Sequence, residues 1–145
     1  MRRVFVASFA VLGLFVVLWS SAAQESSYLV IVNKDNPADS LSKDELSDYL
    51  LKKKSRWENG IPAAPVDLDS KSSVREAFSQ DVHGRSVSSI KNYWQRQIFS
   101  GRGAPPPELT SDDAVISYVA SNSGAIGYVS KSSRINGGVK AVAIN

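Results

Sequence analysis

Three serines and two basic residues stand close together in the stretch VDLDSKSSVREAF, residues 66–78. The pattern predicts the end of a strand, a short turn and the first turns of a helix. The first amides of a helix have no partner within it and carry about half a positive charge, so they can hold a phosphate-like anion. Hydroxyl and basic side chains could add hydrogen bonds and charge, and the candidates are Ser70, Lys71, Ser72, Ser73 and Arg75.

The same stretch has a simpler interpretation. Serine is a favoured N-cap residue because its side-chain oxygen accepts a hydrogen bond from a helix amide, so these serines could only start the helix. Asp69 would also repel an anion unless its carboxyl group is turned away or accepts a proton from the ligand. Residue types alone leave anion binding and plain capping both open.

Enzyme chemistry has few candidates in this chain. His83 is the single histidine and there is no cysteine, so histidine-rich and cysteine metal sites are excluded, and a Ser-His-Asp triad would depend on His83. His83 lies where a helix is expected to end, which favours a capping or surface role. Asp112 and Asp113 fall in the first turn of a predicted helix, where the helix dipole explains them. We expect no enzymatic activity, no cofactor and no metal.

Other aromatic and basic residues have a structural and a functional interpretation. Three large aromatic residues are expected in the core rather than on a ligand platform: Trp57, Tyr93 and Trp94. Arg96 and Arg102 flank a break rich in glycine and proline, where we expect them to solvate a loop, with a cleft as the alternative. Lysines 52–54 suit a solvated helix end, with anion steering as the alternative.

Hydrophobic periodicity and capping signals predict the elements that position these residues. Strands are expected at residues 28–32, 63–68, 125–129 and 139–144, the first of them buried on both faces. Helices are expected after Ser42, at residues 73–82, from about residue 86, and at residues 112–121. Ser42 and Glu45 have the spacing of a capping box. The alternation of strands and helices predicts an α/β sandwich.

The first residues have the anatomy of a secretory signal peptide. Two arginines precede an apolar run at residues 4–18, and small residues at positions 21 and 23 stand where a signal peptidase would cut. The run is shorter than the roughly 20 residues of a membrane span, so we expect cleavage after residue 23 rather than an uncleaved anchor. Residues 24–145 then form a single domain that is periplasmic or secreted.

The charge of that domain is nearly balanced. Residues 1–23 contain two of the 17 Lys and Arg residues and none of the 14 Asp and Glu residues, so the remainder has a net charge of +1. This balance gives no reason to expect nucleic acid, or a membrane after cleavage, as a partner. Because cysteine is absent, the core rather than disulfides must stabilise the domain.

Two segments resemble the phosphate-type substrate-binding proteins of ABC transporters. The stretch YLLKKKSRWENGIPAAPVDLDSKSSVREAF is similar to the family's helix, turn and tryptophan, followed by a strand that enters a Ser-rich, phosphate-gripping helix start. The later stretch SNSGAIGYVS is similar to the family's Gly-(Ser/Ala)-Ile-Gly-Tyr strand, and the resemblance covers about the whole chain after residue 23. The resemblance implies a type II periplasmic binding fold, a mixed sheet flanked by helices, and binding of phosphate or a similar inorganic oxyanion in ABC-type transport.

Two features differ from the family. Full-length family members close two lobes over the ligand, whereas this chain supplies one, so tight binding implies a second copy, or a transporter or envelope partner. The family's loop usually carries Arg and Asp ahead of Ser-Gly-Thr, and the matching positions here hold Leu68 and Ser70, with Ser73 and Val74 in place of Gly and Thr. The alternative function is therefore a ligand-free interaction module of the envelope, derived from a binding-protein lobe.

Overall fold

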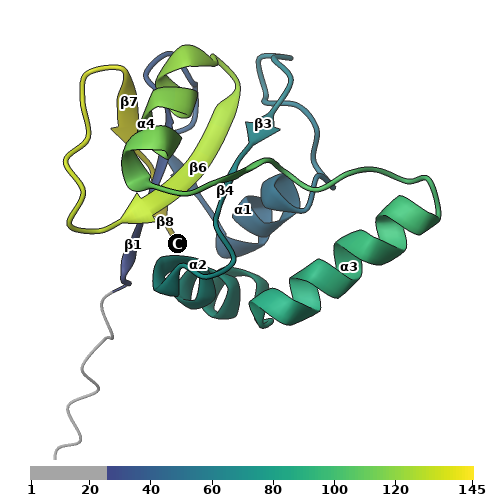
Figure 1. The fold of residues 1–145 in the computed structure, drawn as a ribbon. Coiled ribbons are helices and arrows are strands. Elements are labelled where there is room, and N and C mark those ends of the chain that lie inside the picture. The colour runs from purple at the N-terminus through teal and green to yellow at the C-terminus, as the bar shows by residue number, and fades with distance from the viewer. Residues whose placement is uncertain (1–25) are drawn as a thin grey trace, which may run out of the picture.

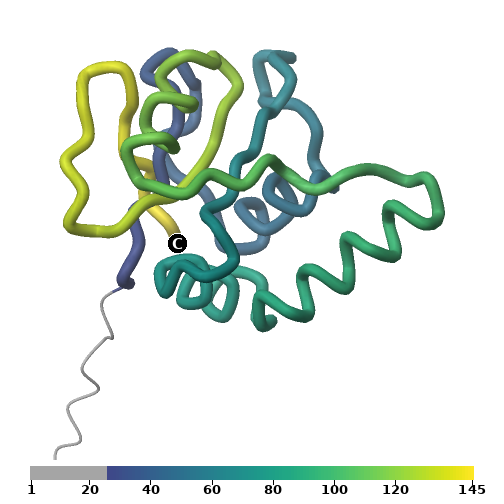
Figure 2. Tube along the Cα trace, in the orientation of Figure 1, coloured from purple at the N-terminus to yellow at the C-terminus, as the bar shows by residue number. Residues whose placement is uncertain are grey.

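The computed structural model describes residues 26–145, which fold around one central sheet (Figures 1 and 2). Residues 1–25 lie outside the described part, and the predicted signal peptide falls among them. Between residues 26 and 145, no helix combines the length and the apolar character needed to cross a membrane.

The central sheet has four strands in the order β3-β6-β1-β7. β1 (Tyr28–Asn33) is antiparallel to β6 (Ala125–Ser130) and β7 (Val139–Ala141), while β3 (Ala64–Pro65) is parallel to β6, so the sheet is mixed. The successive residues Val30, Ile31 and Val32 are each at most 1% exposed. Since neighbouring strand residues point to opposite faces, both faces are covered, as predicted.

Two further sheets have two parallel strands each. β4 (Asp67–Leu68) pairs with β5 (Glu108–Leu109), and β2 (Ser40–Leu41) pairs with β8 (Ala143–Ile144). The single strands predicted at residues 63–68 and 139–144 are therefore wrong, because each segment is divided between the central sheet and a small one. The first division is abrupt: the amide of Val66 still donates to β6, and that of Asp67 donates to the carbonyl of Pro107.

Helices α1 (Lys43–Leu50) and α4 (Asp112–Ser121) begin where capping signals predict them. The Ser42 side chain accepts from the amide of Glu45, and the Glu45 carboxylate accepts from the amide of Ser42, which completes the capping box. Ser111 caps α4 by accepting from the amide of Ala114. Both helices bury one apolar face: Leu46, Tyr49 and Leu50 from α1, and Val115, Ile116 and Val119 from α4.

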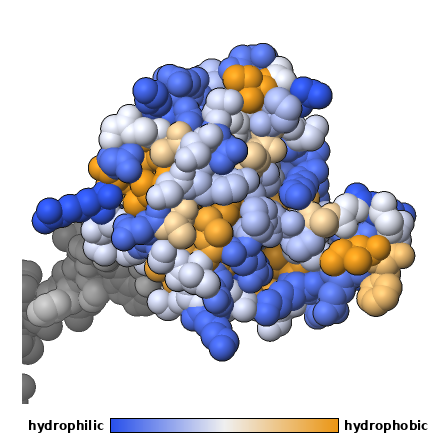
Figure 3. Space-filling view, turned by 45° about the horizontal axis from the view of Figure 1, so that its top comes forward, coloured by the Kyte–Doolittle hydropathy of each residue, from blue (hydrophilic) through white to orange (hydrophobic). Residues whose placement is uncertain are grey.

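Helix α2 (Ser73–Phe78) continues into η1 (Ser79–His83), one turn of π-helix, which Gly84 ends with a left-handed φ of 63°. α3 (Val87–Phe99) follows and projects away from the body of the molecule (Figure 1). The extended segment that returns from its end leads to β5. Figure 3 shows hydrophobic side chains gathered at this projecting end, beside hydrophilic ones.

One hydrophobic core joins the sheet to α1, α2 and α4, and all of its members lie between residues 28 and 144. The Phe78 ring stacks on that of Tyr128 with centroids 3.7 Å apart, and Tyr28 meets Phe78 edge-on. Trp57 and Trp94 are buried as predicted. The predicted fold class, α/β with a mixed sheet flanked by helices, is confirmed.

Candidate functional site

The serine loop, residues 70–73, connects β4 to α2. Ser70 and Ser72 are half-buried, whereas Lys71 and Ser73 are exposed. Asp69 closes the loop: its carboxylate accepts from the amide of Lys71 at 2.8 Å, and its carbonyl accepts from the amide of Ser72 at 2.9 Å. The carboxylate that could repel an anion is thus engaged by the loop's own backbone, and two of the loop's amides are already used.

The first turn of α2 leaves other donors open. Ser72 is the N-cap, and its side-chain oxygen accepts from the amide of Arg75 at 3.3 Å, so the predicted capping is present. This bond uses a lone pair of the Ser72 hydroxyl and leaves its hydrogen free to donate. The amides of Ser73 and Val74 have no acceptor within α2, because the residues four positions before them, whose carbonyls would accept, precede the helix. Capping and anion binding are therefore compatible at this loop.

Arg75 lies beneath the loop rather than beside it. The residue is 4% exposed, and its guanidinium donates to the carbonyl of Leu68 at 2.9 Å and to the carboxylate of Glu108 at 2.6 Å. A third group, the carboxylate of Asp67, lies 3.8 Å away. Two carboxylates thus balance this cation, whereas Lys71 is the exposed cation of the loop itself.

Asp67 is the buried carboxylate of this network. Burial raises the pKa of its carboxyl group, while the Arg75 guanidinium and the Tyr128 hydroxyl act in the opposite direction. Tyr128 donates to Asp67 at 2.7 Å. Burial and the neighbouring carboxylate raise the pKa of Tyr128, so its hydroxyl keeps the proton that it donates. The network ties β4, β5, β6 and α2 together directly under the serine loop.

The structure therefore separates the five predicted site residues into two groups. Ser70, Lys71, Ser72 and Ser73 share the loop between β4 and α2, and Arg75 lies in the ion network below it. Leu68, at the position of the family's arginine, is 3% exposed and packs in the core. No local pattern marks Asp67 as a partner of Arg75, and Glu108 lies 33 residues away along the chain.

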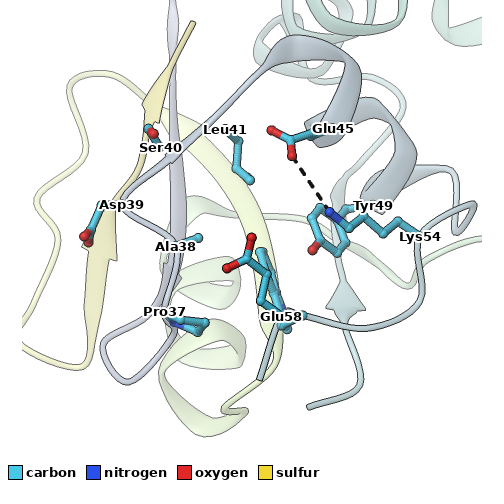
Figure 4. A pocket seen from close by; sticks show the side chains of 10 residues that line it. Pro37, Ala38, Asp39, Ser40, Leu41, Glu45, Tyr49, Lys54 and Glu58 are labelled. Carbon is cyan, nitrogen blue, oxygen red and sulfur yellow. Dashed lines mark ion pairs between the residues drawn. The ribbon is translucent and has the colours of Figure 1, made fainter. Parts of the chain in front are cut away.

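Two cavities of about 180 Å³ each lie outside the serine loop. One separates α3 from the returning segment at residues 105–108, and Arg75 lines its inner end. The other lies between β2, α1 and Trp57 (Figure 4). In this second cavity the ammonium of Lys54 lies 3.8 Å from the Glu45 carboxylate and 5.1 Å from the Tyr49 ring centroid. The Glu45 carboxylate that lines the cavity is therefore already paired with a cation of the same chain. Neither cavity contains a residue of the serine loop.

The Gly-Ala-Ile-Gly-Tyr segment serves packing. A Cβ on Gly124 would collide with the carbonyl oxygen of Pro62, and one on Gly127 would approach Val66 to 2.7 Å and Val115 to 2.9 Å. The carbonyl of Gly124 also accepts from the Trp57 indole at 2.9 Å. These glycines let β6 lie close to β3 and α4, and they therefore position the sheet rather than touch a ligand.

His83 does not take the surface role that the sequence predicts. It is half-buried at the end of η1, where its Nδ1 lies 2.7 Å from the Ser47 hydroxyl and its ring meets Phe78 edge-on. Burial lowers the pKa of His83 to about 4, and the nearby cations Arg75, Arg85 and Lys53 contribute. The ring is therefore neutral at physiological pH. Among the described residues, no group of three or more His, Cys, Asp or Glu side chains could hold a metal ion.

Comparison with known proteins finds similar proteins by structure alone. No family model and no curated protein matches the chain. A putative phosphate ABC transporter substrate-binding protein with bound phosphate from Clostridium perfringens matches with a TM-score of 0.64 and 23% identity, over 81% of this chain and 44% of that one. An ABC-type phosphate transport receptor from Vibrio cholerae gives 0.64 and 20%, over 81% and 46%. A possible phosphate binding protein from Planctomyces limnophilus gives 0.58 and 18%, over 82% and 41%.

These matches confirm the resemblance at the level of the fold. The described domain has the fold of a single lobe of such binding proteins, whose names describe transport rather than enzymes. The chain spans less than half the length of each of these three proteins. Identity is 23% at most, so the likeness establishes the arrangement of helices and strands and no more.

Proposed function

We propose that this chain is an exported, non-enzymatic solute-binding-like protein that holds an inorganic oxyanion, with phosphate as the first candidate, in association with ABC-type transport. The shared fold supports the proposal, because the similar proteins are named for phosphate binding or phosphate transport. The oxyanion would sit at the serine loop, with Ser70, Ser72 and Ser73 donating. Lys71 would add charge from the surface, and Arg75 would act only through the network beneath.

The observation that carries the proposal is the set of donors at the start of α2. The amides of Ser73 and Val74 lack acceptors within the helix, the hydroxyl hydrogen of Ser72 is free, and the Lys71 ammonium is exposed beside them. The Asp69 carboxylate accepts from the amide of Lys71, which holds this negative charge against the loop's own backbone. Amides at a helix start, hydroxyls and one cation are the groups that an oxyanion uses.

The expected affinity is low for one lobe. Three charge-assisted hydrogen bonds contribute about 1.5–3 kcal/mol each, and the helix dipole adds up to about 1 kcal/mol. The sum, roughly 5–10 kcal/mol, precedes the costs of ordering and desolvation, whereas micromolar binding needs about 8 kcal/mol net. An open, solvated half-site should therefore bind near millimolar, and tight capture needs a second copy or a partner that covers the loop.

Titration calorimetry of residues 24–145 with phosphate and with sulfate tests the proposal. We expect heats that fit a dissociation constant of about a millimolar at low ionic strength. An absence of heat at millimolar anion, for the monomer and for a dimerised form, would end the proposal.

A pair of variants at Ser73 locates the site. Ser73→Pro removes the amide hydrogen at the first helical position, where proline is well tolerated, and Ser72 already has the extended ψ of 127° that a following proline requires. Ser73→Ala removes the hydroxyl and keeps the amide. If the amide holds the anion, the proline variant loses one charge-assisted hydrogen bond more than the alanine variant, roughly a tenfold to hundredfold weaker binding. Equal affinities of the two variants would place the anion elsewhere.

A second candidate function is an interaction module that has lost its ligand. Arg75 is balanced by two carboxylates and Leu68 is buried, so the loop has less positive charge than the family's arginine would supply. In that case the loop face binds an envelope or transporter partner. Calorimetry would then show no anion binding. One envelope protein would co-purify with the unmodified chain and would be absent from the purified Lys71→Glu variant. A monomer that retains phosphate and captures no partner would contradict this candidate.

A further inference from the structure

Positive charge is concentrated in and beside α3. Residues 84–107 contain four basic residues and no acidic one, although the chain after residue 23 has a net charge of only +1. Lys91, Arg96 and Arg102 are exposed, and none of them forms an ion pair with a carboxylate in the part of the chain that the structure describes. A nearly neutral domain therefore has a cationic region in and beside α3.

The same helix ends in two exposed apolar side chains. Ile98 is 53% exposed and Phe99 is 91% exposed. Arg96 precedes Phe99 by three positions, which places the two side chains next to each other on the helix surface. We call Arg96, Ile98, Phe99 and Arg102 the α3 tip.

The α3 tip stands away from the rest of the domain. α3 is anchored at its middle by Ile90 and Trp94, which pack on Leu51 in a small cluster of their own. Alongside Trp94, the cavity of about 180 Å³ lies between the helix and the returning segment, and Ile98 is among its lining residues. Figure 1 shows the helix end projecting from the body, and Figure 3 shows hydrophobic side chains gathered there. Exposed aromatic and aliphatic groups at a projecting end, flanked by cations, complement an occupant that is anionic and partly apolar.

We propose that the α3 tip docks on the surface of an anionic lipid bilayer. Phe99 and Ile98 enter the boundary between headgroups and acyl chains, while Arg96, Arg102 and Lys91 contact the anionic headgroups. Net charge alone gives no reason to expect a membrane partner, because it averages the α3 region with acidic regions elsewhere. The cationic, apolar tip is a local feature that the average hides.

Two other occupants fit the observations less well. A second copy that met the first tip to tip would bring the unbalanced cations of both copies together, which is unfavourable. A specific protein interface buries about 800 Å² on each partner, far more than the end of one helix offers, whereas reversible lipid contact needs only a few inserted side chains and several cations.

Vesicle flotation of residues 24–145, which contain the complete core, tests the proposal. The probe is phosphatidylcholine vesicles with about one-third phosphatidylglycerol, in low-salt buffer without phosphate, compared with phosphatidylcholine alone. We expect binding to the anionic vesicles only, and release as salt rises. Phe99→Ser should weaken binding about tenfold or more, because the inserted ring is lost. The double variant Arg96→Gln and Arg102→Gln should weaken it by about tenfold as well.

The matched control is Ile135→Ser, which removes an exposed apolar side chain outside the α3 tip. It should bind like the unmodified chain. The proposal is overturned if the unmodified chain fails to float with anionic vesicles, or if Phe99→Ser floats as well as Ile135→Ser does. It is also overturned if sedimentation equilibrium shows a dimer that depends on Phe99 and vesicles do not bind. None of these outcomes depends on oxyanion binding at the serine loop.

Discussion

The neutral, half-buried His83 makes stability depend on pH in a window where no other side chain has its ordinary pKa. It is the single histidine of the chain, and burial lowers its pKa in the folded protein to about 4. In the unfolded chain the pKa is about 6.5. Because the unfolded state binds the proton more tightly between these values, the contribution of His83 to the free energy of unfolding is present above about pH 6.5. It is lost as the pH drops toward about 4.

The two pKa values fix the size of the effect. Between about pH 7.5 and about pH 5, His83 should remove about 2 kcal/mol from the free energy of unfolding. Urea unfolding at both pH values measures this loss. His83→Gln does not titrate, and its side-chain amide can donate to or accept from the Ser47 hydroxyl, so its loss over the same interval should be smaller by about that amount. The raised pKa of Asp67 acts in the opposite direction, but it is common to both proteins and cancels in the comparison.

A loss that is equal in the unmodified chain and in His83→Gln would refute this reasoning. It would mean that the His83 ring takes up a proton in the folded state as readily as in the unfolded one. Tyrosine and tryptophan fluorescence at each pH would confirm that the two proteins start from the same fold.

Two further stability predictions concern the packing and the ion network under the site. Gly124→Ala should lower the free energy of unfolding by roughly 1–3 kcal/mol through its collision with a neighbouring carbonyl, whereas Gly137→Ala, which has open space, should change it little; thermal unfolding compares them. Arg75→Met should lower the free energy of unfolding by about 3–5 kcal/mol, because it leaves the buried Asp67 carboxylate without its cation. Glu108→Gln, at a half-exposed carboxylate, should lower it by less than about 1 kcal/mol, and urea unfolding measures both. Equal losses for the two glycine variants would contradict the close packing at Gly124. Equal losses for Arg75→Met and Glu108→Gln would contradict the pairing of Arg75 with Asp67.

Local signals predicted most of the elements. The capping box at Ser42 and Glu45 and the cap at Ser111 mark the starts of α1 and α4 because these contacts form within four residues. The apolar run of β1 likewise indicates a strand buried on both faces. The α/β class follows from the order of these elements, and the likeness to a single binding-protein lobe follows from motifs that fix how β6 packs.

Long-range contacts could not be predicted in the same way. The segment at residues 63–68 reads as one strand, and it is divided because Asp67 turns to the chain 40 residues later, at Pro107. The sequence suggests Arg75 as a cation that contacts the anion, but its guanidinium is buried because it pairs with Glu108 and Asp67. His83 reads as a helix end, and its burial depends on α1 and Phe78. In each case at least one of the deciding partners, namely Pro107, Glu108 or Ser47 of α1, is distant in sequence.

The most direct measurement is a titration of ¹⁵N-labelled residues 24–145 with phosphate, followed by amide NMR, against chloride at matched ionic strength. We expect the largest phosphate-specific shifts at the amides of Ser73 and Val74, which lack acceptors in the helix. The amides of Lys71 and Ser72, which already donate to Asp69, should shift less. Largest shifts at residues remote from the start of α2, or shifts no greater than chloride causes, would contradict an oxyanion site at the serine loop.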